Sequence, residues 1–302
     1  MNAIRSQQQE QHLLCSHPLI PQIIFFAPII LWIKCIKHHP LTPISTPYKS
    51  KYPMTKSALL FGLEYLGRPG ELKGCKRDAE EFANFLKEKK GYDKVKVCTS
   101  DSETGAQFMI HKIYKLAIKT WQTPIQEVCI FYSGHGSSFP DYNRDEFDGK
   151  DECLIPTDYR RAGVITDDLL KRVLRYFHPK TNVVFICDAC HSGSMCDLKY
   201  KFDEKTQKSV IAHNSSKCRA RITSISGCKD DQVSYVGFNL RGENQRRSVL
   251  TTFLLKTLDH DQKKSLHDVS KTLSNHVKLS GFNQNPEVMT SFNVQDNDPL
   301  FL

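Results

Sequence analysis

The sequence predicts an α/β fold with a mostly parallel central sheet and helices on both faces. Short apolar runs rich in β-branched residues alternate with amphipathic stretches of helical length, which is typical of strands connected by helices. Two runs, residues 126–132 and 182–187, are largely apolar, as strands buried on both faces of a parallel sheet are. The sequence has no internal repeat, so one sheet of this kind accounts for the chain from residue 55 onward.

The alternation gives the order of the elements. Strands are predicted at residues 58–65, 94–98, 126–132, 182–187, 220–226 and 287–291, and helices at residues 75–89, 105–121, 166–177, 248–258 and 265–279. The first helix carries Ala79, Phe82 and Phe85 on one face, as expected for a helix that packs on a sheet. Residues 200–216 are polar and Lys-rich, which predicts a flexible surface loop between a larger part (55–199) and a smaller part (217–302).

Residues 1–54 differ in composition from the rest of the chain. A Gln-rich stretch precedes an apolar run at residues 19–33, which contains Pro21 and Pro28 and is followed by basic residues and a Pro/Ser/Thr-rich linker. Three interpretations stay open. The run is an anchor, although a membrane span needs about 20 residues; the segment is a disordered tail; or Met54 is the working start.

The charge and the cysteines restrict the class of protein. The formal net charge is +9, and residues 1–54, with five Lys/Arg and one acidic residue, contribute +4 of it. The rest is spread along a chain with acidic clusters, which argues against a nucleic-acid-binding surface. The eleven cysteines lack the regular spacing of a disulfide framework, and several lie in strand-like runs. A reducing, cytoplasmic location is therefore expected, with membrane contact only if residues 19–33 insert.

A histidine and a cysteine follow two of the predicted strands. His135 lies in a Ser-Gly-His-Gly segment after the strand at 126–132, and Cys190 lies just after the strand at 182–187. Ligands of open α/β sheets bind at the carboxyl ends of the strands, so both side chains are expected at one edge. A nearby imidazole activates a thiol, and the sequence therefore predicts His135 and Cys190 as a catalytic pair.

Other interpretations of the cysteine segment are less favoured. Cys187, Cys190 and His191 match the C-x-x-C-H pattern of haem attachment, and the two cysteines match a redox or zinc pattern. No signal peptide is evident, Cys187 belongs to the predicted strand, and no second pair has zinc-ligand spacing. The simplest alternative is that Cys190 is a buried core thiol.

One set of carboxylates accompanies the predicted pair. Asp188 precedes Cys190 by two residues, and Asp78 follows another strand, with Cys75 and Ser133 on the same rims. A carboxylate raises the pKa of a neighbouring thiol, so this arrangement makes sense if a Lys or Arg side chain of a substrate lies between the charges. The alternatives are a helix first-turn role for Asp78 and a loop-capping role for Asp188.

A second acidic set suggests calcium, which prefers oxygen ligands. It comprises Asp148, Asp151, Glu152, Asp167, Asp168 and Asp197. N-capping of a helix is the alternative for Asp167 and Asp168, and the spacing alone makes a weak case because no EF-hand loop is present.

Taken together, five segments resemble the metacaspases, which are cysteine peptidases of family C14 with a caspase-like three-layer fold. These segments are LKGCKRD (72–78), YSGHG (132–136), DGKDECLIPTD (148–158), DACHSG (188–193) and ISGCKDD (225–231). The resemblance covers about residues 57–295 and looks like the type I arrangement, because no long insert separates the two parts. The N-terminal tail departs from the Pro/Gln-rich or zinc-finger prodomains often found in that family.

The resemblance implies the roles of the site residues. His135 and Cys190 are implied as the catalytic dyad of an endopeptidase. The resemblance implies an S1 pocket that selects Lys or Arg before the cleaved bond, formed by Cys75, Asp78, Ser133 and Asp188. The resemblance also implies activation by Ca²⁺, with no organic cofactor. The implied calcium site consists of Asp151, Asp167, Asp168 and Asp197. Protein or peptide substrates and a monomer are expected.

Three rival classes and a self-processing hypothesis complete the expectations. The rivals are a catalytically silent scaffold, an Asp-specific caspase and a peptide ligase using the same acyl-enzyme. A caspase would have Gln where Asp188 stands, which argues against the second. Self-cleavage is expected in or beside the Lys-rich segment, at Lys199, Lys201, Lys205 or Lys208.

Overall fold

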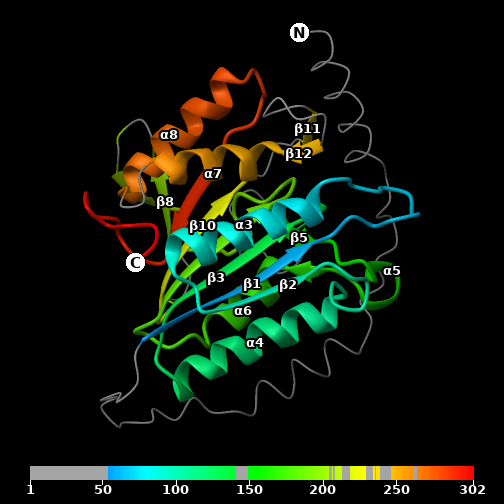
Figure 1. The fold of residues 1–302 in the computed structure, drawn as a ribbon, viewed down its shortest axis with the longest axis horizontal. Helices are drawn as coiled ribbons and strands as arrows, with labels where there is room; N and C mark the ends of the chain where they lie inside the picture. Colours follow the sequence, from blue (N-terminus) through cyan, green and yellow to red (C-terminus); the bar gives the residue numbers. More distant parts are fainter. Residues whose placement is uncertain are drawn as a thin grey trace.

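An eight-stranded sheet forms the centre of the computed structural model, which describes residues 54–140, 149–203, 206, 208–212, 218–228, 234, 236–238, 246–260 and 264–302. The strands lie in the order β2-β1-β3-β7-β10-β13-β8-β9 (Figure 1). Their bounds are β1 Thr55–Gly62, β2 Lys94–Cys98, β3 Ile125–Ser133, β7 Asn182–Asp188, β8 Tyr200–Asp203, β9 Lys208–Ile211, β10 Arg221–Ser226 and β13 Glu287–Thr290. The first five strands of this order pair in parallel, and the remaining pairs are antiparallel.

Helices cover both faces of the sheet (Figure 1). One layer consists of α3 (Cys75–Lys90), α7 (Val249–His260) and α8 (Leu266–Leu279), and the other of α4 (Ala106–Gln122) and α6 (Asp167–Leu174). Alternate residues of a strand point to opposite faces. In β1, Ala58 and Leu60 accordingly pack in the cluster of α3, whereas Leu59 and Phe61 pack in the cluster of α4 and α6. This is the predicted sandwich of helices on both faces.

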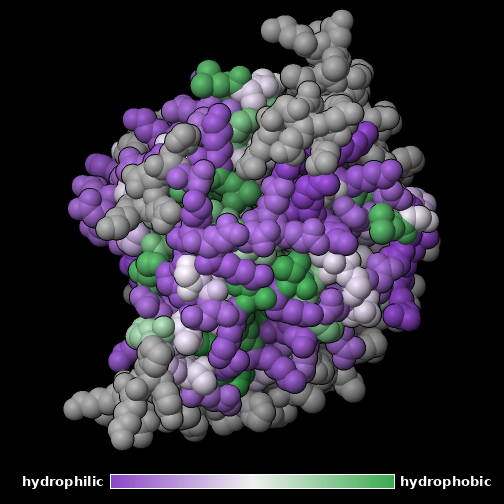
Figure 2. All heavy atoms as spheres, viewed as in Figure 1, coloured by the Kyte–Doolittle hydropathy of each residue, from purple (hydrophilic) through white to green (hydrophobic). Residues whose placement is uncertain are grey.

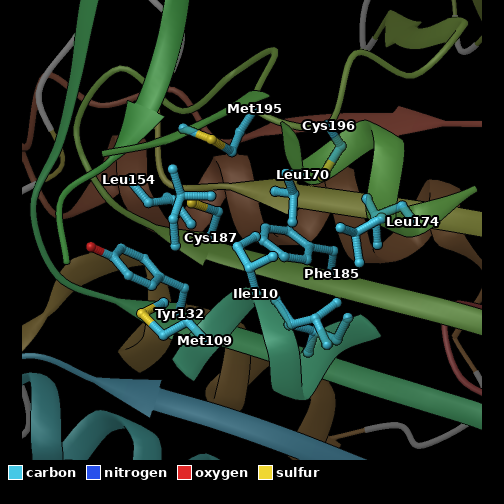
Figure 3. Packing of buried hydrophobic residues seen from close by; sticks show 14 of the residues in the cluster. Met109, Ile110, Tyr132, Leu154, Leu170, Leu174, Phe185, Cys187, Met195 and Cys196 are labelled. Atoms are coloured by element: carbon cyan, nitrogen blue, oxygen red, sulfur yellow. The ribbon is translucent and has the colours of Figure 1, made fainter. Parts of the chain in front are cut away.

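The layer between the sheet and the helices α4 and α6 is densely packed with large apolar side chains (Figure 3). Ile110 from α4 and Leu170 from α6 meet Phe185 and Cys187 of β7, all of them fully or nearly fully buried. Burial of such a side chain stabilises the fold by about 1.5–3 kcal/mol. Figure 2 shows that the outer face over α3 is mainly hydrophilic, with small, separate hydrophobic patches.

Two smaller sheets lie beside the large one. β4 (Gly136–Pro140), β5 (Lys150–Leu154) and β6 (Ile165–Thr166) form an antiparallel sheet, and the short helix α5 (Tyr159–Ala162) lies between β5 and β6 in the chain. β11 (Val236–Phe238) pairs with β12 (Arg246–Ser248). The first of these sheets continues from the end of β3 and so surrounds the histidine segment, while β12 leads directly into α7.

The predicted strands and helices of the large sheet are confirmed, with ends shifted by a few residues. The prediction of a loop was wrong for residues 200–203 and 208–211, where β8 and β9 form a hairpin, and residues 204, 205, 207 and 213–217 lie outside the described part of the chain. In β8, Phe202 is buried while its neighbours Lys201 and Asp203 are half-buried, and in β9 most side chains are exposed. A two-stranded hairpin at the edge of a sheet needs few apolar residues. Its polar, Lys-rich composition therefore resembles that of a loop.

The interpretations of the N-terminal segment lie outside the described residues, which begin at 54. Within the described part of the chain, no helix combines the length and apolar character that crossing a membrane requires.

Candidate active site

The histidine and cysteine segments meet at the carboxyl ends of two adjacent strands. β3 and β7 pair in parallel with Ser133 opposite Asp188, and the backbone N–H of Gly134 donates to the Asp188 carbonyl over 3.2 Å. A Cβ at Gly136 would collide with the carbonyl oxygen of Cys190, so only glycine fits this approach. The structure therefore brings the segments of His135 and Cys190 into contact, as the strand order predicts.

The ring of His135 is held by a backbone carbonyl that the sequence did not indicate. Its Nε2 lies 2.6 Å from the carbonyl oxygen of Gly70. A carbonyl only accepts hydrogen bonds, so Nε2 carries the proton and Nδ1 is the acceptor of the neutral ring. Gly70 has φ +88°, and a Cβ there would lie 3.2 Å from Nε2. The loop thus fixes the tautomer of the predicted base.

Two tyrosines hold the backbone of His135. The hydroxyl of Tyr65 accepts the His135 N–H over 3.0 Å and donates to the Ile155 carbonyl over 2.5 Å. The hydroxyl of Tyr132 donates to the His135 carbonyl over 2.7 Å. The Tyr65 ring also lies 4.8 Å, centroid to centroid, from the imidazole. Burial raises the pKa of the Tyr65 phenol, so this residue acts as a neutral hydrogen-bonding group.

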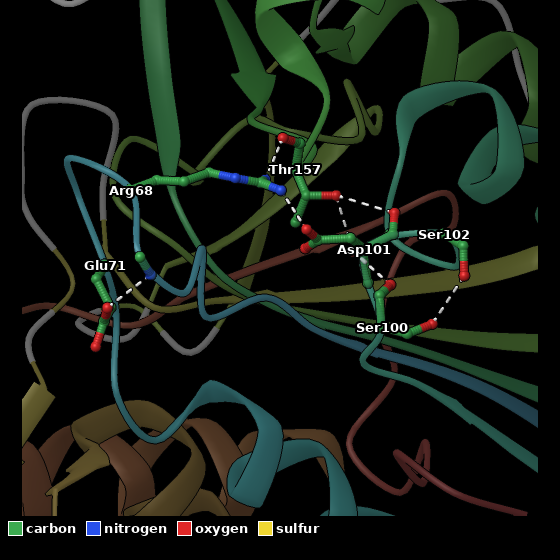
Figure 4. A network of polar contacts seen from close by, with 8 residues as sticks. Arg68, Glu71, Ser100, Asp101, Ser102 and Thr157 are labelled. Carbon is green, nitrogen blue, oxygen red and sulfur yellow. Dashed lines mark hydrogen bonds and ion pairs between the residues drawn. The ribbon is translucent and has the colours of Figure 1, made fainter.

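The loop that carries Gly70 is anchored through Arg68 (Figure 4). The Arg68 guanidinium donates from Nη1 to the Thr157 carbonyl over 2.6 Å and pairs through Nη2 with Asp101. Glu71 closes the loop from within, because its carboxylate accepts the Gly67 N–H over 2.9 Å. These bonds tie the loop to the segments before α4 and after β5, which keeps the Gly70 carbonyl in place beside the imidazole.

Cys190 and Cys187 lie on opposite sides of the sheet. Cys190 is only 5% exposed, packs in the cluster of α3 and α7, and has its Sγ 3.7 Å from the Ser234 carbonyl oxygen. Cys187 is a free thiol in the cluster of α4 and α6. The two thiols of the C-x-x-C pattern therefore face different layers, which argues against a redox pair or a shared metal.

Two buried carboxylates stand beside the cysteine segment. Asp78 comes from the first turn of α3 and Asp188 ends β7, and both are nearly inaccessible to solvent. Ser248 connects them, because its N–H donates to Asp78 Oδ2 over 3.2 Å and its hydroxyl donates to Asp188 Oδ2. Thr251 adds two donors to the same Asp188 oxygen, its N–H at 3.1 Å and its hydroxyl at 2.6 Å.

The electrostatics of this acidic pair are unusual. Burial, and then the charge of Asp188, raise the pKa of Asp78 well above its ordinary value. Burial also raises the pKa of Asp188, against the opposing effect of its hydroxyl donors. The Cys75 thiol has a raised pKa as well, from burial and from Asp78, although its hydrogen bond with Ser133 acts in the opposite direction. The Cys75 thiol thus interacts with the other three predicted S1 residues, Asp78, Ser133 and Asp188, in a buried acidic environment.

The second acidic set is brought to one region without forming a ready metal site. Asp167 accepts backbone N–H groups on both oxygens, from Glu152 and from Asp168, each over 2.6 Å. Asp197 pairs with Lys171 Nζ at 3.3 Å. Over the described ranges, no group of three His, Cys, Asp or Glu side chains is arranged to hold a metal ion. The predicted calcium residues that are described, Asp151, Asp167, Asp168 and Asp197, thus do not form a ready-made cluster of ligands. Asp148 lies outside the described residues.

Asp151 lies in β5 and Asp168 at the start of α6. The charges of Asp167, Glu152 and Asp151 all raise the pKa of the Cys153 thiol, after the larger effect of its burial. Asp168 lies in the first turn of α6, where the Thr166 hydroxyl accepts the Leu169 N–H over 3.2 Å. Thr166 is therefore the N-cap residue of α6, and Asp167 and Asp168 follow it in the first turn.

Three of the four lysines proposed as self-cleavage sites lie in the described part of the chain. Lys199 is half-buried just before β8, Lys201 lies in β8 and pairs with Glu287, and Lys208 is exposed at the start of β9. Lys205 lies outside the described residues.

Sequence reasoning missed the residues that support the predicted site. These are Tyr65, Gly70, Ser234, Ser248 and Thr251. Gly70 acts through its carbonyl, which has no side-chain signature. Ser248 and Thr251 are ordinary residues of a predicted helix start, 60 or more residues from Asp188. The Gly-rich loop before α3 was the only available signal.

The comparison with protein families decides which family this geometry belongs to. Residues 56–199 match the model described as the metacaspase, peptidase C14 domain. These residues are a metacaspase domain. They contain every residue predicted here for the dyad, the S1 pocket and the calcium site.

Curated metacaspases are about 35% identical to this chain over the residues that align. Metacaspase-1B of Aspergillus niger is 36% identical over 153 residues, which is 49% of this chain and 35% of the relative. Metacaspase-1 of Plasmodium falciparum is 35% identical over 188 residues, or 60% and 31% of the two chains. Metacaspase-1B of Neosartorya fischeri is 35% identical over 213 residues, or 65% and 51%. The chain thus spans about a third to a half of the curated relatives it matches.

Solved structures agree on the fold. A protein of Geobacter sulfurreducens superposes with a TM-score of 0.56 at 24% identity, over 78% of this chain and 93% of that one. Caspase-1 of Spodoptera frugiperda superposes with a TM-score of 0.50 at 14% identity, over 81% and 92% of the two chains. The predicted caspase-like sandwich is therefore confirmed for this chain.

Proposed function

We propose that this chain is a cysteine-type endopeptidase in which Cys190 is the nucleophile and His135 its base. The observation that carries the proposal is the contact between their two segments at the ends of β3 and β7, beside a buried pair of carboxylates. A thiol needs a neighbouring base to react at neutral pH, and an acidic pocket beside it selects a cationic side chain. The match of residues 56–199 to the metacaspase family model supports the same activity.

The proposed reaction has two steps. The Cys190 thiolate attacks the carbonyl carbon of the scissile bond, and His135, having taken the thiol proton, gives it to the leaving amine as the C–N bond breaks. A water molecule then gives a proton to His135 and its hydroxide to the thioester carbon, and the C–S bond breaks to release the carboxylic acid and regenerate the Cys190 thiolate. Backbone N–H groups near Gly136 and Cys190 stabilise the oxyanion in both steps. The Gly70 carbonyl keeps the imidazole in one tautomer.

The proposed substrates are proteins and peptides with Lys or Arg on the amino side of the cleaved bond. The side-chain cation would approach Asp78 and Asp188, whose neighbours Cys75 and Ser133 complete the pocket. Two carboxylates of one sign in a buried space repel each other, and an entering cation relieves this repulsion.

The test of the proposal is peptide hydrolysis. Fluorogenic peptides ending in Arg, Lys or Asp would be incubated with the full chain, with added calcium and with chelator. Cleavage after Arg and Lys and none after Asp is the expected result. Cleavage after Asp would overturn the pocket assignment, and a folded protein that cleaves none of the peptides would indicate a catalytically silent scaffold.

The acidic pocket predicts a pH dependence. The raised pKa values of Asp78 and Asp188 mean that their charge is lost at a higher pH than for ordinary carboxylic acids. A cationic side chain needs the ionised form, so kcat/KM for Arg peptides should fall as pH decreases through these raised values, before ordinary Asp residues titrate. The measurement is the pH profile of kcat/KM for an Arg peptide. An acid limb near the ordinary pKa of aspartate would contradict the assignment.

Calcium activation is proposed from the family resemblance. The acidic residues of the proposed site already have other partners. Lys171 holds an ammonium against Asp197, and Asp167 is occupied by backbone donors. We expect calcium to raise both the activity and the Tm, and chelator to abolish activity. Lys171→Met, which removes the competing cation, should bind calcium more tightly by calorimetry. Unchanged activity in excess chelator would remove calcium from the proposal.

Self-cleavage is expected once the peptidase is active. Lys201 and Lys208 lie in paired strands, and cleavage there requires the β8–β9 hairpin to open first. Intact-mass measurement after calcium addition should therefore give fragments ending at one of the four lysines (Lys199, Lys201, Lys205 or Lys208) in the active protein and none in Cys190→Ala. An unchanged mass in the active protein would contradict self-cleavage at these lysines.

A further inference from the structure

Four hydrogen-bond donors converge on the carboxylate of Asp188. Oδ2 accepts the hydroxyls of Ser248 and Thr251 and the N–H of Thr251, and Oδ1 accepts the Ser234 hydroxyl over 2.9 Å. Ser248 and Thr251 are themselves 2% and 1% exposed. A buried carboxylate with so many donors is strongly solvated by the protein in place of water. Asp188 is therefore satisfied before any substrate cation arrives.

The donors come from the start of α7, far along the chain from Asp188. Ser248 ends β12 and Thr251 lies in the first turn of α7, where backbone N–H groups have no partner within the helix. Asp188 provides the acceptor for one of them, and the positive end of the helix dipole favours its negative charge. The S1 pocket is thus completed by the second part of the chain, beyond the residues 56–199 of the matched family model.

Asp78 and Asp188 differ in what surrounds them. Asp78 accepts the Ser248 N–H, with Arg247 and Glu81 as its charged neighbours from β12 and α3. Asp188 faces Asp78 and Cys75 from α3 and lies beside Cys187 of its own strand. Of the two repelling acids, Asp188 has the hydroxyl donors, so it is the one expected to hold its charge before substrate binds.

We propose that Ser248 and Thr251 are positioning residues of the S1 pocket, which hold the Asp188 carboxylate ionised and in one orientation for the side-chain cation of the substrate. This inference rests on the proposed peptidase function. Three donors on Oδ2 fix the plane of the carboxylate, and a fixed plane is what bidentate recognition of a guanidinium requires. Loss of a donor should weaken Arg recognition more than the chemistry at Cys190.

Thr251→Val tests the proposal, because valine has the same shape and lacks the hydroxyl. We expect KM for an Arg peptide to rise about tenfold with a smaller change in kcat, as for the loss of a hydrogen bond to a charged group. The acid limb of kcat/KM should move up by about one pH unit, because the lost donor stabilised the ionised form. Thr251→Ser should restore both values.

Thr252→Val is the matched control. Thr252 is the next residue of α7 and is equally buried, and its hydroxyl has no hydrogen-bond partner among the described residues. We expect it to leave KM and the pH profile unchanged. At a pH where Asp188 is ionised in every variant, the rate of Cys190 alkylation by iodoacetamide, followed by peptide mass spectrometry, should be the same in all of them, because that reaction does not use the pocket.

The outcomes separate this inference from the proposed function. If the wild-type chain cleaves no Arg or Lys peptide, the proposed function itself is wrong. A wild-type chain that cleaves them, with Thr251→Val and Thr252→Val giving equal KM and equal pH profiles, overturns the positioning role alone. If Thr251→Val does not fold, Ser248→Ala gives the same test, since it removes the hydroxyl and keeps the N–H that Asp78 accepts.

Discussion

Replacing Cys190 by alanine is expected to abolish peptide hydrolysis, with a loss in kcat of at least about 10⁴-fold. The reason is that the side chain forms the covalent bond. The other described thiol near that strand end, Cys228, is fully buried, with its Sγ 3.5 Å from the Ala189 carbonyl oxygen. Cys187 is buried in the opposite layer, and the Cys75 thiol has its pKa raised by burial and by Asp78. The measurement is the hydrolysis rate of an Arg peptide, with circular dichroism to show that the fold is retained.

Cys187→Ala is the control for this variant. It removes a thiol three residues away that packs against α4 and α6, and it should retain activity while losing some stability to the small cavity. A redox or metal function of the C-x-x-C pattern would instead require both cysteines. Full activity in Cys190→Ala would end the peptidase account, and equal loss in both variants would favour the paired-thiol interpretation.

The sheet could be predicted because its strands carry long apolar runs. β3 and β7 are each buried along nearly their whole length, so periodicity marks them clearly. β6 has two residues and β8 four, and such short, partly exposed strands give no periodic signal. The hairpin of β8 and β9 was hidden by its lysines, since charged residues are what natural proteins place on exposed sheet edges.

The sequence predicted the side chains proposed to react or to bind substrate, but not the groups that hold them in place. The segments of His135 and Cys190 were expected together because parallel neighbouring strands end at one edge. The Gly70 carbonyl and the Thr251 donors could not be expected, because backbone groups have no signature and the start of α7 meets Asp188 only through tertiary packing. The calcium prediction came from the family resemblance, which does not reveal that Lys171 lies against Asp197.

Asp188→Asn is expected to lower kcat/KM for Arg and Lys peptides by about 10²- to 10³-fold, because the cation then enters a buried site without its counter-charge. The substitution keeps the shape of the side chain. The amide oxygen can accept the Ser248 and Thr251 donors on the Oδ2 side, and the amide nitrogen can donate to the Ser234 hydroxyl. The kinetic loss should therefore come with little loss of stability, a change in Tm of a few degrees.

Asp78→Asn distinguishes the roles of the two acids, because their surroundings favour the ionised form of Asp188 over that of Asp78. If Asp188 holds its charge before substrate binds and Asp78 is the more readily protonated partner, removing the Asp78 charge should cost less at neutral pH than removing that of Asp188. It should also move the acid limb of kcat/KM to lower pH, since Asp188 then loses its repelling neighbour. The two variants are compared by kcat/KM for Arg peptides across pH, with Cys190 alkylation as the measure of an intact dyad. Equal losses in both variants and an unmoved acid limb would mean that the pocket carries two fixed charges, and the asymmetry inferred from the hydroxyl donors would be wrong.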